Sequence, residues 1–509
     1  MLVDTTSAVD RRAPSPPAAS APRSRPWIPV VAVAALALAV RSARVTSESL
    51  RVDEAWTVWV ADHPPAEVPG ILASSDTHPP LSYVAQSLWR VVGTGDLAVR
   101  SLSVVASVAT VVVVALLARR LAGGRVGLTA GVLLAVSPWH VQHAADARMY
   151  ALAGLAVAVA LTGAVEVVTA TTAGRRRVGM ATYAAAAVAG LYTHNAVAVT
   201  VVAIGVATAV VLARDGDRAA LRAWGWANVA VAGLWALWWP SLLGQVGRLD
   251  EALAWAGDPS ADGVRSTLGA PLAWASDGRP WWAGVWLDVA VVALAVLGAR
   301  RLGRPGWVLL AAFAALPVVA LGLAAVDHTL VDRVLLPSSV AVYPLVAAAL
   351  WRLGRWVGGL GTLALVVAAL PGLLGPQPVG QRSEFERAAQ LVAAEATPDT
   401  VVVYAASFGQ LGIDRYVDLP GPEIGVPADF FADPWGSSTV TWTSLDELER
   451  RVAGRDDVWL VSTLRGSVNP DRRIERRLGR TLTPTTCLQL RGIELVHLTA
   501  EGERDPACP

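Results

Sequence analysis

Two adjacent carboxylates, Asp53 and Glu54, stand shortly after the first apolar run of the sequence. Desolvation near hydrocarbon raises the pKa of a carboxyl group, so that the group can act as a base at neutral pH. The pair therefore predicts proton transfer at a membrane surface. The alternative is a solvated pair of loop acids, which is a common feature of proteins.

A histidine beside two prolines is the second candidate. His78 is followed by Pro79 and Pro80, which fix the backbone where a surface helix is predicted to begin. Because a helix start favours anions, His78 is a candidate contact for a phosphate. The alternative is an interfacial turn with an incidental histidine.

Residues 137–150 join two apolar runs and concentrate polar side chains. These side chains are His140, His143, Asp146, Arg148 and Tyr150. A charge within a membrane helix costs up to ~3 kcal/mol on insertion scales, so its presence indicates a partner or a ligand. The alternative is an interfacial anchor of tryptophan, arginine and tyrosine. Two histidines and one aspartate at this spacing are only a weak metal signal.

Two further polar segments interrupt apolar sequence. His194 lies where an outer turn between two runs is expected. The tenth run is preceded by Asp327, His328, Asp332 and Arg333. The chain contains no lysine, and arginine is the better phosphate clamp because its planar fork binds two oxygens at once. A satisfied turn histidine and an Asp332–Arg333 salt bridge are the structural alternatives.

The composition indicates a membrane protein. Apolar residues make up 54% of the chain and charged residues only 16%, with a mean hydropathy of +0.47. Soluble domains carry about 25% charged residues. The net charge of +1 lacks the basic surplus that a nucleic-acid partner requires.

Eleven apolar runs are candidates for membrane spans, which need roughly 17 to 25 residues. They are residues 27–42, 98–118, 126–141, 149–170, 179–193, 195–213, 224–243, 283–299, 307–326, 334–350 and 357–375. With the N-terminus inside, every arginine cluster between runs falls on the cytoplasmic side, as the positive-inside rule requires. Residues 79–92 are predicted to lie on the outer surface as an amphipathic helix, because a twelfth span would move later arginines outside.

The predicted fold is an α-helical polytopic membrane protein with about eleven transmembrane helices and a small C-terminal α/β extracytoplasmic domain. Residues 1–26 are interpreted as a disordered cytoplasmic tail, 27–376 as the membrane domain and 381–509 as the extracytoplasmic domain. Alternating helix and strand patterns in the last part lie at 384–396, 401–405, 444–453, 458–462 and 494–498. Cys487 and Cys508 both fall there and suit either one disulfide or two unrelated thiols.

The order of these motifs resembles a known family. The Asp-Glu pair is followed by His-Pro-Pro-Leu at 78–81, an arginine-led second span at Arg100, Ala-Arg-Met-Tyr at 147–150, Tyr-Thr-His at 192–194 and Asp-Arg-Val-Leu-Leu-Pro at 332–337. This series resembles the dolichyl-phosphate-mannose protein mannosyltransferases and their bacterial relatives, which are type C glycosyltransferases. The resemblance covers about residues 27–350.

The resemblance implies roles for individual residues. Asp53 would be the catalytic carboxylate and Glu54 its acidic neighbour. The implied substrate- and phosphate-binding side chains are His78, His143, Asp146, Arg148, Tyr150, His194 and Arg333. Val334 stands where the family has an aromatic residue, so no ring contact is expected at that position.

The implied activity is transfer of a sugar, mannose in the first place, from a polyprenyl-phosphate carrier to a hydroxyl of a glycan, lipid or protein acceptor in the cell envelope. The anomeric configuration would be inverted, on the extracytoplasmic face of the plasma membrane. No cofactor is certain, although a divalent cation is compatible, and the further partners are membrane lipids. The tryptophan-rich loop at 245–282 offers stacking faces for sugars or an interfacial aromatic belt. Alternatives are a polyprenyl-phosphate arabinose transferase, a transporter or lipid flippase, and a non-catalytic scaffold.

Overall fold

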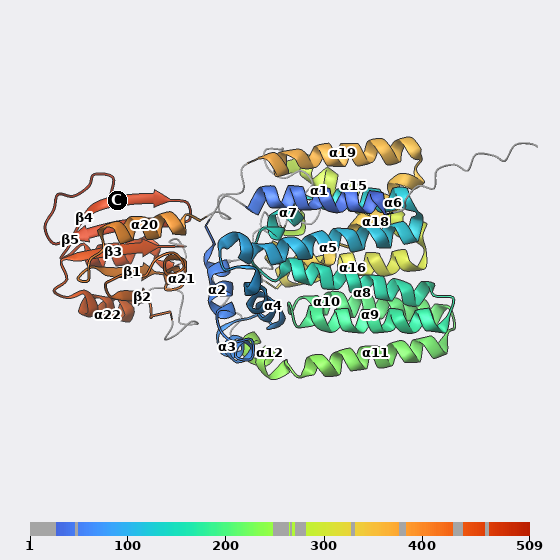
Figure 1. Ribbon diagram of the computed structural model, residues 1–509, viewed down its shortest axis with the longest axis horizontal. Helices are drawn as coiled ribbons and strands as arrows, with labels where there is room; N and C mark the ends of the chain where they lie inside the picture. Colours follow the sequence, from blue (N-terminus) through green and yellow to red (C-terminus); the bar gives the residue numbers. More distant parts are fainter. Residues whose placement is uncertain are drawn as a thin grey trace, which may run out of the picture.

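The computed structural model describes residues 27–45, 49–247, 264, 267–269, 281–326, 331–375, 383–430, 441–463 and 468–508. The predictions for the N-terminal tail, for Asp327 and His328, and for most of the tryptophan-rich loop lie outside these residues. Within them, the chain forms an elongated helical bundle with a smaller α/β domain beyond one end (Figure 1). The predicted fold class, a polytopic helical membrane protein with a small C-terminal sheet domain, is confirmed.

Apolar helices, some long and some short, build the bundle, and each predicted apolar run contributes to at least one of them. They are α1 (Ile28–Val45), α5 (Asp96–Ala122), α6 (Gly124–Ala135), α7 (Pro138–Ala144), α8 (Tyr150–Thr169), α9 (Ala173–Leu191), α10 (Val197–Arg214), α11 (Arg218–Ala236), α12 (Trp239–Val246), α15 (Trp281–Leu302), α16 (Arg304–Ala324), η4 (Asp332–Leu335), α17 (Leu336–Ser339), α18 (Val342–Arg352) and α19 (Arg355–Leu374). A run of apolar sequence is therefore a sound predictor of helix here, because a lipid-facing backbone must satisfy its own hydrogen bonds.

The predicted number of spans is not confirmed. Among the described residues, 6 helices are long and apolar enough to cross a membrane, or up to 8 if two bent pairs each count as one span. The run at 126–141 is divided into α6 and α7, because Pro138 starts a new helix one residue after Ser137. Helix α9 carries three consecutive arginines, Arg175–Arg177, near its start, which shortens its apolar part.

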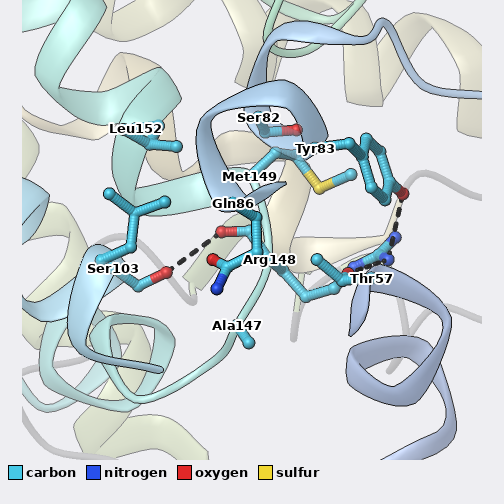
Figure 2. Close-up of a pocket in the computed structure, with 10 residues that line it drawn as sticks. Thr57, Ser82, Tyr83, Gln86, Ser103, Ala147, Arg148, Met149 and Leu152 are labelled. Atoms are coloured by element: carbon cyan, nitrogen blue, oxygen red, sulfur yellow. Dashed lines mark hydrogen bonds between the residues drawn. The ribbon is translucent and has the colours of Figure 1, made fainter. Parts of the chain in front are cut away.

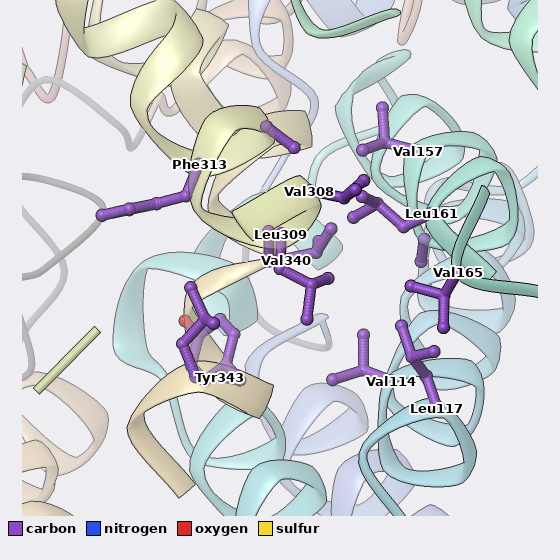
Figure 3. Close-up of a cluster of buried hydrophobic side chains, with 14 of the residues drawn as sticks. Val114, Leu117, Val157, Leu161, Val165, Val308, Leu309, Phe313, Val340 and Tyr343 are labelled. Atoms are coloured by element: carbon purple, nitrogen blue, oxygen red, sulfur yellow. The ribbon is translucent and has the colours of Figure 1, made fainter. Parts of the chain in front are cut away.

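Alanine, valine and leucine side chains make up most of the core of the bundle. Val114, Leu161 and Val308 come from three different helices and meet in one cluster with Tyr343 (Figure 3). Helices α8 and α9 lie especially close, since a Cβ at Gly163 would stand 2.5 Å from the backbone nitrogen of Tyr183. Such close approach through small residues is how membrane helices associate.

Four short helices cover the end of the bundle that faces the α/β domain: α2 (Val52–Ala61), α3 (Val68–Ser75), α4 (Leu81–Trp89) and α12 (Figure 1). Helix α4 has 9 residues and continues into the 3-10 turn η1 (Arg90–Val92), so the segment predicted to lie on the surface is too short to be a span. The helix ends that carry the arginine clusters lie at the opposite end of the bundle (Figure 1). Their cytoplasmic side rests on the positive-inside rule and stays a prediction.

The C-terminal domain is a three-layer α/β fold. Its strands are β1 (Val401–Ala405), β2 (Glu423–Val426), β3 (Asp457–Ser462), β4 (Thr483–Leu490) and β5 (Ile493–Thr499). They form one sheet in the order β2-β1-β3-β5-β4, parallel over the first three strands and antiparallel over the rest. The pairing places Val403 opposite both Ile424 and Leu460.

Alternate residues of β1 enter two separate cores, one on each face of the sheet. Helices α22 (Trp442–Val452) and α24 (Arg473–Leu478) pack on one face, while α20 (Phe385–Glu395) and α21 (Gly409–Asp414) pack on the other. The 3-10 turn η6 (Pro470–Arg472) precedes α24.

Cys487 and Cys508 form a disulfide, so the first of the two alternatives for these residues holds. All five predicted segments of this domain correspond to α20, β1, α22, β3 and β5.

Candidate active site

Helix α2 carries both carboxylates of the Asp-Glu pair and begins one residue before them. Arg51 precedes the helix in an extended conformation, and its backbone N–H donates to Glu54 Oε2 at 2.9 Å. This hydrogen bond, one half of a capping box, satisfies a backbone donor outside the helix and fixes the glutamate side chain. Two acids in the first turn also complement the positive end of the helix dipole. The local sequence thus explains why the two neighbours point in different directions.

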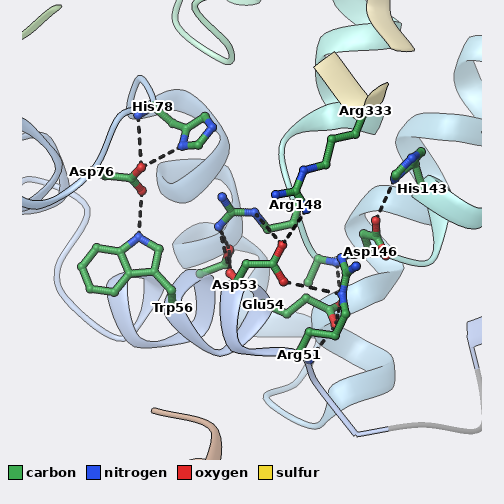
Figure 4. A network of polar contacts seen from close by, with 12 residues as sticks. Arg51, Asp53, Glu54, Trp56, Asp76, His78, His143, Asp146, Arg148 and Arg333 are labelled. Atoms are coloured by element: carbon green, nitrogen blue, oxygen red, sulfur yellow. Dashed lines mark hydrogen bonds and ion pairs between the residues drawn. The ribbon is translucent and has the colours of Figure 1, made fainter. Parts of the chain in front are cut away.

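Asp53 lies among three guanidinium groups, of which those of Arg148 and Arg333 come from distant parts of the chain (Figure 4). Arg333 Nη1 is 3.3 Å and Arg148 Nε is 3.9 Å from Asp53 Oδ2, and Arg51 Nε is 3.5 Å from Oδ1. The Asp53 side chain is 29% exposed, so a substrate can reach it from outside. These ion pairs are long, which leaves the carboxylate and the arginines able to take other partners.

The pKa of Asp53 is lowered from its ordinary value. Burial alone would raise this pKa, but the positive charges of Arg51, Arg148 and Arg333 outweigh burial. Asp53 is therefore ionised at neutral pH, and a negative ligand that engaged the arginines would make it a stronger base.

Glu54 has the opposite environment, since its side chain is 1% exposed. Arg100 donates from Nε to Oε1 at 2.9 Å and from Nη2 to Oε2 at 2.7 Å. The backbone N–H of Ala147 donates to Oε1 at 2.8 Å, and the backbone N–H of Arg51 donates to Oε2. A carboxylate accepts about four hydrogen bonds, so the capacity of Glu54 is filled. It joins α2, α5 and the segment that precedes α8.

Residues 143–150 bring three more predicted residues to the site. Asp146 Oδ1 lies 3.1 Å from Arg51 Nη2, and Asp146 Oδ2 lies 2.9 Å from His143 Nδ1. Burial would raise the pKa of Asp146, but Arg51 and His143 hold it below its ordinary value. The Arg333 guanidinium stands 5.7 Å from the ring centre of Tyr150, within cation–π range.

His78 reaches the site through Asp76, which was not among the predicted site residues. Asp76 accepts hydrogen bonds from Trp56 Nε1 at 2.7 Å and from Tyr83 Oη at 2.5 Å, and its Oδ1 lies 2.7 Å from His78 Nδ1. Arg148 Nη1 in turn donates to Tyr83 Oη at 3.2 Å. A continuous polar chain therefore runs from His78 through Asp76, Tyr83 and Arg148 to Asp53.

The ring of His194 lies close to the rings of both His78 and Tyr150. Its ring centre is 5.4 Å from that of His78 and 5.6 Å from that of Tyr150. Its Nδ1 accepts from the Ala196 backbone N–H at 3.1 Å, so a neutral ring must carry its proton on Nε2. Burial, followed by the charges of His78 and Arg148, lowers the pKa of His194 well below its ordinary value. His194 is thus a neutral side chain at physiological pH.

A small cavity of about 10 Å³ lies behind Arg148, between α4, α5 and α8 (Figure 2). Its lining includes Thr57, Tyr83, Ser103 and Arg148. This volume has room for about one water molecule, so the cavity is too small to hold a sugar.

All nine predicted site residues belong to one connected network at one end of the bundle. Sequence reasoning missed Arg51, Asp76 and Tyr83, and it recorded Arg100 only as the start of a span. The positions of these residues in the sequence could have indicated them. Arg51 stands two residues before Asp53, and Asp76 and Tyr83 lie on either side of the two prolines. Across the described part of the chain, no group of three or more His, Cys, Asp or Glu side chains is arranged to hold a metal ion.

Comparison with known proteins supports this architecture. Residues 77–240 match the sequence model of the dolichyl-phosphate-mannose-protein mannosyltransferase family. That segment includes His78, Asp146, Arg148 and His194 of the site. No curated protein sequence matches the chain significantly.

Solved structures share the fold at low sequence identity. ArnT from Cupriavidus metallidurans, bound to undecaprenyl phosphate, is similar with a TM-score of 0.63 and 14% identity, over 92% of this chain and 97% of that one. The oligosaccharyltransferase of Archaeoglobus fulgidus, in complex with Zn and sulfate, is similar with a TM-score of 0.52 and 11% identity, over 92% of this chain and 72% of that one. The resemblance drawn from the motifs is therefore confirmed: the chain has the type C glycosyltransferase fold and carries, at residues 77–240, the sequence signature of the dolichyl-phosphate-mannose-protein mannosyltransferases.

Proposed function

We propose that this protein transfers a sugar from a polyprenyl-phosphate carrier to an acceptor hydroxyl, with inversion at the anomeric carbon. The observation that carries the proposal is the partly exposed carboxylate of Asp53 between the guanidinium groups of Arg148 and Arg333. An inverting transfer needs a base for the acceptor and fixed cations for the leaving phosphate. Both lie here within one small region at the end of a membrane helix bundle.

In the proposed reaction, Asp53 accepts the proton of the acceptor hydroxyl while the hydroxyl oxygen forms a bond to the anomeric carbon. The bond from that carbon to the phosphate oxygen breaks on the opposite face, and its electron pair leaves with the polyprenyl phosphate. Negative charge grows on the phosphate as this bond breaks, so Arg148 and Arg333 stabilise the transition state more than the ground state.

The low pKa of Asp53 in the free protein fits this sequence of events. Without a donor, the three arginines hold Asp53 ionised. A phosphate that binds Arg148 and Arg333 neutralises part of their charge, and the pKa of Asp53 then rises toward that of a better base. In this proposal, donor binding itself prepares the base.

Glu54 takes a different role in the proposal from the one predicted from sequence. Its four filled hydrogen bonds leave it no place for a proton from the acceptor. We assign it as a positioning residue that fixes α2 against α5.

Two proteins of the same fold bind carriers of the proposed chemistry. ArnT from Cupriavidus metallidurans was solved with undecaprenyl phosphate, and AglB from Archaeoglobus fulgidus, with a TM-score of 0.50, was solved with a dolichol-phosphate and an inhibitory peptide. We further propose mannose as the sugar, with arabinose as the alternative. A glycan, lipid or protein of the cell envelope would be the acceptor, reached from the extracytoplasmic face of the plasma membrane.

The test uses the purified full-length chain in lipid with polyprenyl-phosphate mannose or arabinose and a cell-envelope acceptor extract. The expected result is release of polyprenyl phosphate from one of the two donors. Arg333→Ala should lower this rate by about 10²-fold or more, since a lost charged donor at a leaving group costs a few kcal/mol. Arg301→Ala, at the opposite end of the bundle, is the matched control and should retain the rate. No release from either donor, together with lipid or solute movement in vesicles, would replace the proposal by a transporter.

A further inference from the structure

The C-terminal domain is hydrogen-bonded to the segment that leads into the helix of Asp53. Ser49 Oγ donates to the carbonyl of Ser383 at 2.7 Å, and Ser383 Oγ donates to the carbonyl of Leu50 at 3.1 Å. Val52, the first residue of α2, packs against the core formed by α20 and the sheet. The two residues before Arg51 are therefore held by the soluble domain.

Tyr416 makes the most direct of these contacts. The backbone N–H of Leu50 donates to Tyr416 Oη at 2.6 Å, and Tyr416 Oη donates to Asp96 Oδ2 at 2.5 Å. Tyr416 follows α21, and Asp96 is the first residue of α5. One phenol thus joins the start of α2, the start of α5 and the C-terminal domain.

Arg415 holds the other oxygen of the same carboxylate. Its Nη2 donates to Asp96 Oδ1 at 2.9 Å and to the carbonyl of Thr94 at 2.6 Å. Arg100, which holds Glu54, stands four residues further along α5, about one helical turn. The geometry between α2 and α5 is consequently fixed twice, by Glu54–Arg100 inside the membrane domain and by Tyr416–Asp96 from the soluble domain.

An apolar contact extends the same interface along α2. Ala55 packs with Leu411 of α21 and with Phe430, and the Trp56 ring meets the Phe430 ring edge-on with centres 5.8 Å apart. Trp56 is also the residue that donates to Asp76 in the polar network. The side of α2 away from the bundle therefore rests on the C-terminal domain (Figure 1).

We propose that the C-terminal domain positions Asp53. It does so through Tyr416, a positioning residue that binds the backbone at the start of α2. The inference rests on the proposed function for what Asp53 does. Helix α2 has 10 residues, a length at which an isolated helix is marginal, so its position depends on its neighbours. A displacement of about 1 Å at a reacting group costs about 10²-fold in rate.

The test compares Tyr416→Phe with Asp96→Asn and with the double variant, all as full-length protein in lipid. Tyr416→Phe keeps the ring and removes the hydroxyl that links Leu50 to Asp96. We expect kcat to fall by about 10-fold or more, with KM for the donor changed by less than about threefold, because the phosphate contacts are untouched. The double variant should lose less than the product of the two single losses, since the two variants share the Tyr416–Asp96 hydrogen bond while each also removes one contact of its own, to Leu50 or to Arg415. Amide hydrogen exchange should become faster over residues 50–56.

Tyr404→Phe is the matched control. Tyr404 lies in β1, and its hydroxyl donates to Glu423 of β2, inside the C-terminal domain. This variant should lower the unfolding temperature of the domain but leave kcat and the exchange at 50–56 as in wild type. An equal loss of kcat in both variants would reduce the effect to general destabilisation and overturn the proposal. Wild-type kcat and exchange in Tyr416→Phe would also overturn it. If wild type used no polyprenyl-phosphate sugar, the proposed function would fail, and hydrogen exchange would still decide whether Tyr416 orders α2.

Discussion

Arg100 binds both carboxylate oxygens of Glu54, with Nε 2.9 Å from Oε1 and Nη2 2.7 Å from Oε2, and the pair is almost fully buried. Removing one member of such a pair leaves the other charge buried without compensation, which typically costs about 3–5 kcal/mol. The Arg100–Glu54 pair is therefore more important for the fold than for proton transfer.

We predict that Arg100→Leu strongly destabilises the protein, because Glu54 would lose its buried partner. Glu54→Gln should be milder, since the amide keeps the size of the side chain and an acceptor oxygen for one of the two backbone donors. The measurement is the unfolding temperature of purified protein in detergent or lipid. Arg90→Leu serves as control, because its ion pair with Asp62 is largely exposed and such pairs contribute little. If Arg100→Leu unfolded at the wild-type temperature, as Arg90→Leu is expected to do, the Glu54–Arg100 pair would not stabilise the fold.

Asp76 gives a prediction about pH and stability. Burial would raise its pKa, but His78, Arg148 and Tyr83 hold it below the ordinary value. A depressed carboxyl pKa contributes stability that is present above the unfolded pKa of about 3.9 and is lost as pH falls through the folded value. Asp76→Asn should therefore lower the unfolding temperature at pH 7, and its difference from wild type should narrow only below about pH 4. A constant difference across this range would show that the charge of Asp76 is not the cause.

Arg333 gives a prediction about pH and rate. Arg333 lies 3.3 Å from Asp53 and is one of the three cations that lower the pKa of this carboxyl group. Removing a nearby cation disfavours the ionised form, so Arg333→Ala should raise the pKa of Asp53. In a profile of kcat/KM against pH, the acid limb of the variant should lie at higher pH than that of wild type. If the acid limb of the variant lay at the same pH as that of wild type, Arg333 would not influence the ionisation of Asp53.

Much of the fold was predictable because lipid imposes a simple rule, and the polar network was predictable only in part. The apolar runs locate helices, since backbone groups in hydrocarbon must bond within a helix. The apolar runs do not give the correct number of spans, because Pro138 divides one run into two helices and Arg175–Arg177 lie near the start of α9. Motif order indicated Asp53, Arg148 and Arg333. The sequence did not reveal the Tyr83 and Tyr416 contacts, because each joins residues far apart in the chain through a single hydroxyl.

The disulfide of the C-terminal domain offers a test of sidedness. The arginine clusters and the domain lie at opposite ends of the bundle, so positive-inside orientation places Cys487 and Cys508 outside the cytoplasm. After mild reduction of intact cells, a membrane-impermeant thiol reagent should label the protein. Substituting Ser for both cysteines provides the control. Labelling that appears only after lysis would reverse the orientation.

The central claim is that Asp53 accepts the proton in transfer from a polyprenyl-phosphate sugar. Asp53→Asn keeps the size of the side chain but removes the base, so the protein should insert and fold while the rate falls by about 10²- to 10⁴-fold. Asp62→Asn, at the exposed end of the same helix, is the matched control and should keep the wild-type rate. The decisive measurement is release of polyprenyl phosphate by the two variants in lipid at equal amounts of folded protein. Release near the wild-type rate from Asp62→Asn and almost none from Asp53→Asn is the predicted result, whereas equal release from both would contradict the account.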